Sequence, residues 1–273
     1  GHMQLCLQCR ACETACPSSV PFGSLMASTR NEIQMKISRT WLERFVRWLV
    51  FKQLLPHQRR LRLAFRLARL YQRSGCQRVV RSCKLKWILP SHLSAIEEMM
   101  PTLPKISFPP PHLQFVPAQR ATRYRVGLFS GCVMPLVFGD VNAATVRVLT
   151  LNGCDVVIPN TQGCCAALNV HNGEQTVALS MAKRNIDAFE NAGVDYVVNN
   201  AAGCGAMLKE YGELLEHDQE YAERAKEFVE KVRDITEFLA NIPLVKPTTV
   251  MRKRVTYQDS CHLAHAQRIK VEP

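Results

Sequence analysis

Residues 125–132, RVGLFSGC, show the pattern that decides the fold. A short apolar run leads directly into a Gly–Cys pair, as a buried strand does where it ends at a turn. The pattern occurs twice more, because the apolar runs at 155–159 and 194–198 each lead to a glycine followed by cysteine. The cysteines that follow the three runs are Cys132, Cys164, Cys165 and Cys204. The chain therefore contains a repeated strand-to-cysteine unit.

Helices are expected between these strands. Residues 140–152 and 174–192 have apolar side chains at helical spacing, and Gly153 and Gly193 supply stop signals. The inward positions that this spacing predicts are Val141, Ala144, Val148 and Leu151 in the first helix, and Ala178, Ala182, Ile186 and Phe189 in the second. Strands that alternate with helices indicate an α/β fold with parallel strands. We expect this cysteine-rich module to cover residues 118–245.

The cysteines of this module are expected to form one site. The carboxyl ends of parallel strands meet at one edge of an open α/β sheet, where ligands bind. The four cysteines named above each follow a strand, so they can converge at that edge as ligands for a metal or a cluster. Cys154 comes before a strand, at the opposite edge, and is expected only to pack in the core.

A second cysteine pattern lies in residues 6–17, CLQCRACETACP. Its two-residue gaps, then a three-residue gap and a proline, match the run of bacterial ferredoxins. Short loops of this kind bring three thiolates to one [4Fe–4S] cluster, which we expect on Cys6, Cys9 and Cys12. In two-cluster ferredoxins the fourth cysteine binds the other cluster, which is the role expected for Cys16. Zinc and disulfides are the alternatives, but zinc sites usually use two separated cysteine pairs, and such short gaps disfavour disulfides.

The other ligands of a cluster on Cys16 are not apparent in the sequence. Cys76 or Cys83 could supply one, although each also fits an ordinary position on a helix face. Near the other end, residues 254–261 align with 125–132 at a constant offset of 129 residues, which matches Cys261 to Cys132. We therefore expect a truncated second module at 246–273, in a chain that is a fragment at both ends.

The positive charge is concentrated in one segment. The formal net charge is +12, and residues 30–86 hold sixteen Lys and Arg against two acidic residues. An apolar helical run at 41–55 precedes a helix with a basic stripe beside an apolar face. The stripe is Arg59, Arg62, Arg66, Arg69 and Arg73, and the apolar face is Leu61, Ala64, Phe65 and Ala68.

Two interpretations of this segment remain open. It is either a solvated face on packed helices or a docking surface for an anionic membrane or an acidic partner. Nucleic acid is not expected, because no nucleic-acid-binding motif accompanies the charge. Six prolines between 101 and 117 then predict a linker that a helix cannot cross.

Length and composition exclude several classes of protein. With 273 residues, 47% of them hydrophobic, the chain can bury a core and is not disordered in composition. No apolar stretch reaches the roughly 20 residues of a membrane span, and no signal-peptide pattern is seen. No G-x-G-x-x-G fingerprint for a flavin or a nicotinamide is present.

Together these motifs resemble the iron–sulfur subunit of glycolate oxidase and its relatives. The relatives include lactate-utilisation proteins, the iron–sulfur subunit of anaerobic glycerol-3-phosphate dehydrogenase and the catalytic subunit of heterodisulfide reductase. Members join ferredoxin-type runs to two cysteine-rich modules, each with a Cys, a later Cys-Cys-Gly and a later Cys-x-x-Cys. Residues 6–17 resemble the ferredoxin part and the four strand-end cysteines resemble the first module. Residues 254–267 resemble the start of the second module, in which Cys261 would be a ligand.

Two residues depart from the family pattern. Ala166 replaces the glycine after the cysteine pair, and Met207 stands where the last cysteine would be. A thioether is a poor iron ligand beside a thiolate, so the resemblance does not support a five-cysteine cluster here. Four thiolates can still hold an ordinary cluster, or the site is degenerate. His171, His262 and His265 could hydrogen-bond a cluster, a substrate or a quinone, although His171 also fits an ordinary polar position.

The resemblance implies an electron-transfer subunit rather than a complete enzyme. Residues 1–30 would carry a [4Fe–4S] cluster, residues 31–117 would be the basic helices and linker, and the module would hold a possible second cluster. An FAD-containing dehydrogenase partner would oxidise a 2-hydroxy acid such as glycolate or lactate, and electrons would pass to a quinone or another acceptor. The expected location is the cytoplasm, with peripheral contact at the inner face of the cell membrane as an option. The alternative is a thiol–disulfide oxidoreductase subunit of the heterodisulfide reductase type.

Overall fold

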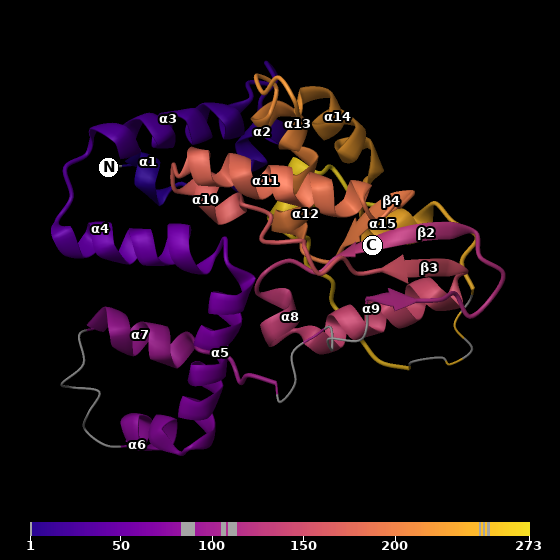
Figure 1. The fold of residues 1–273 in the computed structure, drawn as a ribbon, viewed down its shortest axis with the longest axis horizontal. Coiled ribbons are helices and arrows are strands. Elements are labelled where there is room, and N and C mark those ends of the chain that lie inside the picture. The colour runs from indigo at the N-terminus through magenta and orange to yellow at the C-terminus, as the bar shows by residue number, and fades with distance from the viewer. Residues whose placement is uncertain are drawn as a thin grey trace.

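The computed structural model describes residues 2–82, 91–104, 108, 114–245, 247, 249 and 252–273. The N-terminal part is helical and lies mainly on the left in Figure 1, whereas the strands lie on the right. Its elements are α1 (His2–Leu5), α2 (Ala11–Ala15), α3 (Phe22–Lys36), α4 (Trp41–Arg47), the π-helix η1 (Trp48–Leu54), α5 (Gln58–Arg73), α6 (Cys76–Ser82) and α7 (Ser91–Met99).

A mixed α/β module follows. Its first half contains β1 (Phe115–Val116), β2 (Tyr124–Phe129), α8 (Met134–Val137), α9 (Gly139–Leu151), β3 (Cys154–Val157), α10 (Ala167–His171) and α11 (Gln175–Glu190). Its second half contains β4 (Tyr196–Asn199), α12 (Ala202–Lys209), α13 (Tyr211–Leu214), α14 (Ala222–Lys231), β5 (Val232–Asp234) and α15 (Ile235–Ala240). The π-helix η3 (His262–Ala266) lies near the C-terminus.

The five strands form one sheet in the order β1-β3-β2-β4-β5. Strands β2 to β5 pair in parallel and β1 adds an antiparallel edge. Apolar side chains from both faces of the sheet are buried in two separate clusters, one with α11, α12 and α14 and the other with α9 and α15. This is a doubly wound arrangement, and it confirms the α/β fold with parallel strands.

The central strand shows why its sequence contains a glycine. A Cβ atom at Gly127 would lie 2.6 Å from the ring of Phe189, which packs across β2 from α11. Phe189 also contacts Phe129 and Phe228, with ring centroids 6.1 Å apart in each pair. Gly127 therefore lets α11 approach the sheet closely, which sets the position of the helix that supports the cysteine loops.

The predicted strands and helices of the module are confirmed within two residues at each end. The inward face of α11 is also confirmed, because its four predicted positions are all buried. The predicted face of α9 is wrong, since Val141, Val148 and Leu151 are exposed. The buried face instead carries Asn142 and Thr145, which both hydrogen-bond the side chain of Asn200 inside the fold.

The basic helices pack on the module through apolar side chains of η1 and the first half of α5. Helix α4 begins at a capping box in which Thr40 and Glu43 each bond the other's backbone amide. The predicted apolar face of α5 is confirmed, with Leu61 buried together with Leu55 in the core of the module. The guanidinium of Arg184 donates to the carbonyl oxygen of Pro56 at 2.7 Å. None of the described helices is long and apolar enough to cross a membrane.

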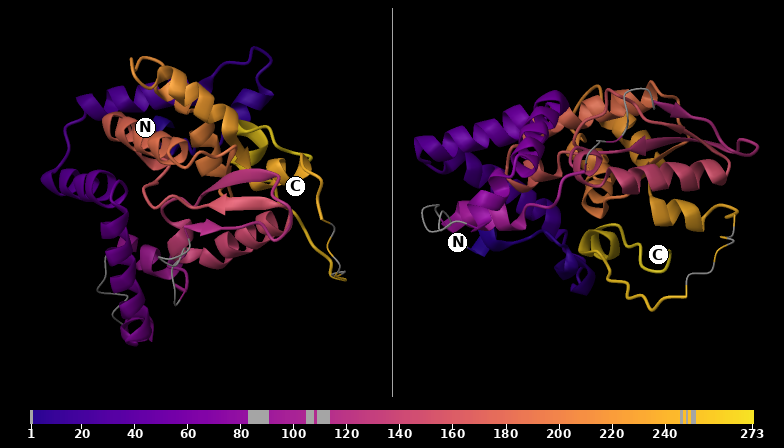
Figure 2. Two further views of the ribbon diagram at one scale, coloured as in Figure 1. Left: turned by 45° about the vertical axis from the view of Figure 1, so that its right-hand side comes forward. Right: turned by 90° about the horizontal axis from the view of Figure 1, so that it is seen from below.

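The C-terminal segment returns to the rest of the molecule after a long excursion, drawn in yellow in the right-hand view of Figure 2. Residues 254–260, which align with β2 and its turn, are exposed and form no strand, since no neighbouring strand pairs with them in the described part of the chain. The following η3 packs on α12, and the amide of Gln267 donates to the carbonyl oxygen of Ala202. The expected linker at 101–117 lies partly outside the described residues.

Candidate functional site

The four module cysteines meet at the carboxyl edge of the sheet. Strand β2 lies between β3 and β4, so the chain leaves β2 for one neighbour and later crosses to the other. This change of direction creates a crevice beside the ends of the central strands, the usual ligand site of open α/β folds. Cys132 follows β2, the Cys164-Cys165 pair follows β3, and Cys204 opens α12 after β4.

The four cysteines lie next to one another in a row. Cys132 interacts with Cys164, Cys164 with Cys165, and Cys165 with Cys204. The interaction with Cys164, together with burial, raises the pKa of the Cys132 thiol. The Cys132 thiol is therefore held neutral, and a cation that bound it would have to displace its proton.

The loop that carries the cysteine pair contains a strained residue. Ala166 has φ 73° and forms the N-cap of α10 in the left-handed conformation that favours glycine. This is the position at which the sequence departs from Cys-Cys-Gly. Non-glycine residues persist in this conformation only where their surroundings hold them, and Ala166 is fully buried among the cysteines of the core.

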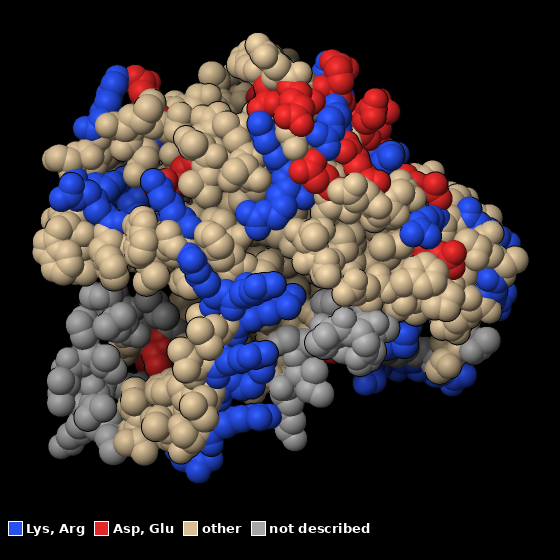
Figure 3. Space-filling model, viewed as in Figure 1, with Lys and Arg blue, Asp and Glu red and all other residues tan. Residues whose placement is uncertain are grey.

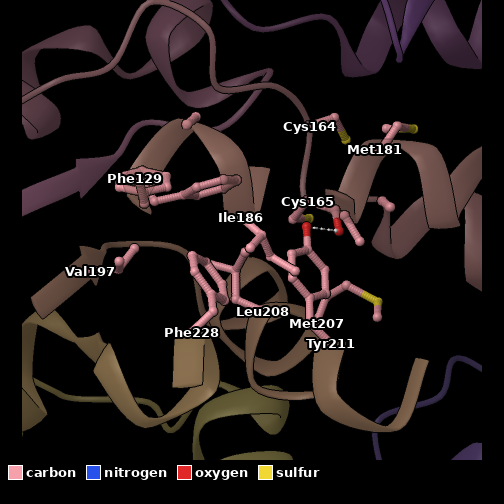
Figure 4. Close-up of a cluster of buried hydrophobic side chains, with 14 of the residues drawn as sticks. Phe129, Cys164, Cys165, Met181, Ile186, Val197, Met207, Leu208, Tyr211 and Phe228 are labelled. Carbon is pink, nitrogen blue, oxygen red and sulfur yellow. Dashed lines mark hydrogen bonds between the residues drawn. The ribbon is translucent and has the colours of Figure 1, made fainter. Parts of the chain in front are cut away.

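Buried polar side chains hydrogen-bond the backbone of the loop that carries Cys164 and Cys165. The amide group of Asn185 accepts from the backbone of Gly163 at 2.7 Å and donates to the carbonyl oxygen of Cys164 at 3.0 Å. It also donates to the hydroxyl of Tyr211. That hydroxyl donates in turn to the carbonyl oxygen of Cys165, the bond drawn in Figure 4. These bonds hold the backbone of the cysteine pair in one conformation.

A second buried amide joins the first and second cysteine loops. Gln162 accepts from the backbone amide of Ser130 at 2.8 Å and donates to the carbonyl oxygen of Leu128 at 3.1 Å. It therefore ties the end of β2 to the loop that leads from β3 to the cysteine pair. Gly131 follows with φ 70°, which turns the chain toward Cys132.

The N-terminal run Cys6–Cys16 is built from tight turns. Gln8 and Arg10 have φ 53° and 60°, so left-handed residues flank Cys9 on both sides. The backbone amide of Gln8 points at the sulfur of Cys6 at 3.4 Å. Backbone amides of Val20 and Ser18 hydrogen-bond the sulfur of Cys16 and lower its pKa.

Amides aimed at sulfur are what a thiolate-ligated cluster requires, because they stabilise the negative sulfur. The residues present therefore fit an iron–sulfur cluster. Across the described residues, no three His, Cys, Asp or Glu side chains are arranged to hold a single metal ion. A cluster binds each thiolate to a different iron atom, so its ligands stand further apart than those of one ion.

Two arginines attach the N-terminal run to the module. Arg10 forms an ion pair with Glu210, which follows α12, at 2.8 Å. Arg30 donates to the carbonyl oxygens of Met3 and Cys6 and, from its other nitrogen, to that of His171. The run and the carboxyl edge of the sheet are therefore held side by side, although they are more than 100 residues apart in the sequence.

The three histidines singled out in the sequence lie at this junction. The rings of His171 and His262 stack with centroids 6.1 Å apart, and Nδ1 of His265 lies 2.8 Å from the hydroxyl of Thr14. Burial, and then the neighbouring His262, lower the pKa of His171 to about 4. His171 is therefore neutral at physiological pH, and its ring contacts the second histidine rather than a cysteine.

Other predicted positions fall outside the cluster of four. Cys261 is exposed, as is Cys76 on α6, and both are free cysteines. Cys83 lies outside the described residues. Cys154 is fully buried in the other core cluster, at the opposite edge of the sheet from the four cysteines.

The residues that position the cysteines were not found from the sequence. Asn185 and Tyr211 lie in regions whose helical pattern indicates only packing, and Arg10 is one of many basic residues. Gln162 carries the clearest signal, because a polar residue directly precedes the Gly163-Cys164 turn. Such contacts depend on which segments meet in space, and a single sequence does not show this.

The burial of Glu210, the partner of Arg10, predicts a pH dependence of stability. Burial raises the pKa of Glu210 to about 7 from its usual 4.5, and Arg10 only partly offsets this. Between these two values the folded state holds a proton that the unfolded state has released, so the free energy of unfolding falls as the pH rises. The fall is about 3 kcal/mol at most, at 1.36 kcal/mol per pKa unit.

Thermal unfolding at pH 5 and pH 8 of the wild type and of Glu210→Gln tests this prediction. The variant cannot titrate at this position, so from pH 5 to pH 8 the wild type should lose stability relative to the variant. Parallel pH profiles of the two proteins would contradict it. A constant offset between them would report only the lost ion pair.

Comparisons with known proteins agree with this geometry. Residues 42–100 match a family model described as the linker region of the glycolate oxidase iron–sulfur subunit, and residues 126–209 match a cysteine-rich domain. The chain is 42% identical over 99% of its length to a probable glycolate oxidase iron–sulfur subunit of Bacillus subtilis, and 32% identical over 99% to the glycolate oxidase iron–sulfur subunit of Escherichia coli. No solved structure matches the chain.

A third relative matches about half of the chain. Lactate utilization protein A of Oceanobacillus iheyensis is 35% identical over 55% of the chain. The chain spans 62%, 61% and 61% of the lengths of these three relatives, respectively.

Proposed function

Because this chain belongs to the family of glycolate oxidase iron–sulfur subunits, we propose that it carries electrons for a flavin-dependent 2-hydroxy-acid dehydrogenase. The proposal rests on one observation above all, the convergence of four cysteines from three strand ends at the carboxyl edge of the sheet. Their sulfurs already contact one another, and the surrounding amides hold the loops that present them.

We assign a [4Fe–4S] cluster to the N-terminal run. Cys6, Cys9 and Cys12 would hold it, and Cys16 would serve a further cluster, as in two-cluster ferredoxins. Bound iron–sulfur clusters accept and release single electrons. The chain's own residues supply thiolates, donate backbone hydrogen bonds to sulfur and, at the sheet edge, keep water away from the buried cysteine pair.

The module is proposed as a second cluster site with four thiolates. Met207, which stands where a fifth cysteine would lie, is 3% exposed and packs in the same core cluster as the cysteine pair. Its thioether is a weak ligand, so an ordinary four-thiolate cluster fits this module better than a five-cysteine one. This disfavours the heterodisulfide reductase type of reaction for this module.

The substrate chemistry is assigned to a partner. The curated relatives include glycolate oxidase subunits and a lactate utilization protein, so we propose an FAD-containing dehydrogenase that oxidises glycolate or lactate. A quinone or another acceptor would receive the electrons. Free thiols and oxygen-sensitive clusters suit the reducing cytoplasm.

The basic helices, from α4 to α5, are proposed to contact the inner face of the membrane. Trp41, Phe45 and Trp48 are exposed on α4 and at the start of η1, where aromatic rings suit the lipid–water interface. Arginines of the same segment would meet anionic headgroups. Charge and exposed aromatic side chains together favour a peripheral contact of this kind over a purely solvated surface.

Anaerobic reconstitution with iron and sulfide tests the electron-transfer proposal. The folded chain should bind iron and sulfide in equal amounts, and reduction should produce a reversible EPR signal. Glycolate or lactate should then reduce the clusters only when the flavoprotein partner is added. A folded chain that remains free of iron would contradict the proposal, and so would reduction without the partner.

A further inference from the structure

A cavity of about 520 Å³ lies at the carboxyl edge of the sheet, on the side of β3. One wall is the turn Ser130–Gly131 at the end of β2, and a second is the loop 158–162 after β3. The third wall is α5, which contributes Arg59 and Arg62. The cavity is thus shared between α5, one of the basic helices, and the turn that leads to Cys132.

The cavity carries an unbalanced positive charge. Arg59 and Arg62 are three residues apart on the same side of α5, and neither forms an ion pair within the described part of the chain. No acidic side chain is among the described lining residues. The basic stripe continues along α5, where Figure 3 shows Lys and Arg gathered. An anion is therefore attracted to this opening from a distance.

The remaining walls select the kind of anion. Asn160 and Thr161 supply polar groups, whereas the half-buried Pro159 supplies an apolar surface. A guanidinium binds a carboxylate or a phosphate through paired hydrogen bonds, so the arginines alone do not distinguish the two. The apolar surface favours a ligand with a carbon skeleton over a bare inorganic ion.

The turn beside the cavity is firmly held. The side-chain amide of Gln58 donates to the carbonyl oxygen of Gly131 at 3.3 Å, and Gln162 fixes the backbone of Ser130. These bonds connect α5 and the loop after β3 to the turn that precedes Cys132. A ligand bound here would thus contact both α5 and the turn Ser130–Gly131 that precedes Cys132.

We propose that this cavity binds a small organic carboxylate through Arg59 and Arg62. The inference concerns a ligand site separate from the cysteines, and it holds whether or not the chain transfers electrons. Its ligand is a short-chain acid with one or two carboxylates that lies between the arginines and the apolar surface of the loop after β3.

Titration calorimetry of the anaerobically purified chain tests the proposal, with succinate as the probe and uncharged succinamide as its matched control. Succinate should bind saturably at one site per chain, and succinamide should not. The variant Arg59→Gln/Arg62→Gln should weaken succinate binding at least tenfold. Arg66→Gln/Arg73→Gln makes the same change of charge on the same stripe but outside the cavity lining, and should weaken it less than threefold.

Three results would overturn the inference. Equal weakening by both double variants would show only general attraction to the basic stripe. Inorganic phosphate that binds as tightly as succinate would contradict the need for a carbon skeleton. Cosedimentation with anionic vesicles that requires Arg59 and Arg62, without succinate binding, would assign these arginines to a membrane surface instead.

Discussion

Replacing Cys9 with alanine should remove about four iron atoms per chain from the reconstituted protein, the content of one [4Fe–4S] cluster. Cys9 lies between two left-handed residues, Gln8 and Arg10, so the turn presents its side chain at a fixed place in the run. Alanine offers no ligand atom, so only two of the three cysteines assigned to this cluster would remain, and the cluster would no longer be held in the site. Iron and sulfide analysis measures the loss directly.

The matched control for this variant is Cys76→Ala. Cys76 is also a free cysteine, but it is exposed on α6, away from the run at 6–17 in the sequence. Its removal should leave the iron content unchanged. If Cys9→Ala keeps all its iron, or if Cys76→Ala loses as much, the run at 6–17 does not hold the cluster. The module cysteines remain intact in both variants and serve as an internal reference.

The strand ends and their cysteines could be predicted because each depends on local sequence. An apolar run followed by a glycine fixes where a strand ends, and parallel strands necessarily bring their carboxyl ends to one edge. Cys132 and Cys204 are therefore placed together by topology, without knowledge of any contact between them. The same reasoning places Cys154 at the other edge, where it is buried in the opposite core cluster.

The prediction failed where polar groups are buried. Apolar spacing in α9 predicted that the face with Val148 is buried. The structure instead exposes Val148 and buries a different face of α9, which carries Asn142 and Thr145. Their partner is Asn200, which comes from another strand end, so the buried face depends on a contact that the local sequence does not encode. The ion pair of Arg10 with Glu210 was missed for the same reason.

Replacing Asn185 with leucine should remove a large part of the stability of the fold. The side chain is fully buried and hydrogen-bonds Gly163, Cys164 and Tyr211. Leucine has a similar size but cannot form these bonds, so a backbone amide and a carbonyl are left buried without partners. Each such group costs about 1–3 kcal/mol, and we expect a total of about 3–5 kcal/mol.

Denaturant unfolding of three single variants and one double variant separates this network from a general effect of the substitution. Asn191→Leu makes the same change at the exposed C-cap of the same helix, and should alter the free energy of unfolding by less than about 0.5 kcal/mol. Tyr211→Phe removes only the hydroxyl that bridges Asn185 and Cys165, and should cost about 1 kcal/mol. Because Asn185 and Tyr211 share a hydrogen bond, the double variant should lose less than the sum of the two losses. Additive losses would mean that the two side chains act independently. A small effect of Asn185→Leu would mean that the cysteine loop is held by its own turn rather than by the amide of Asn185.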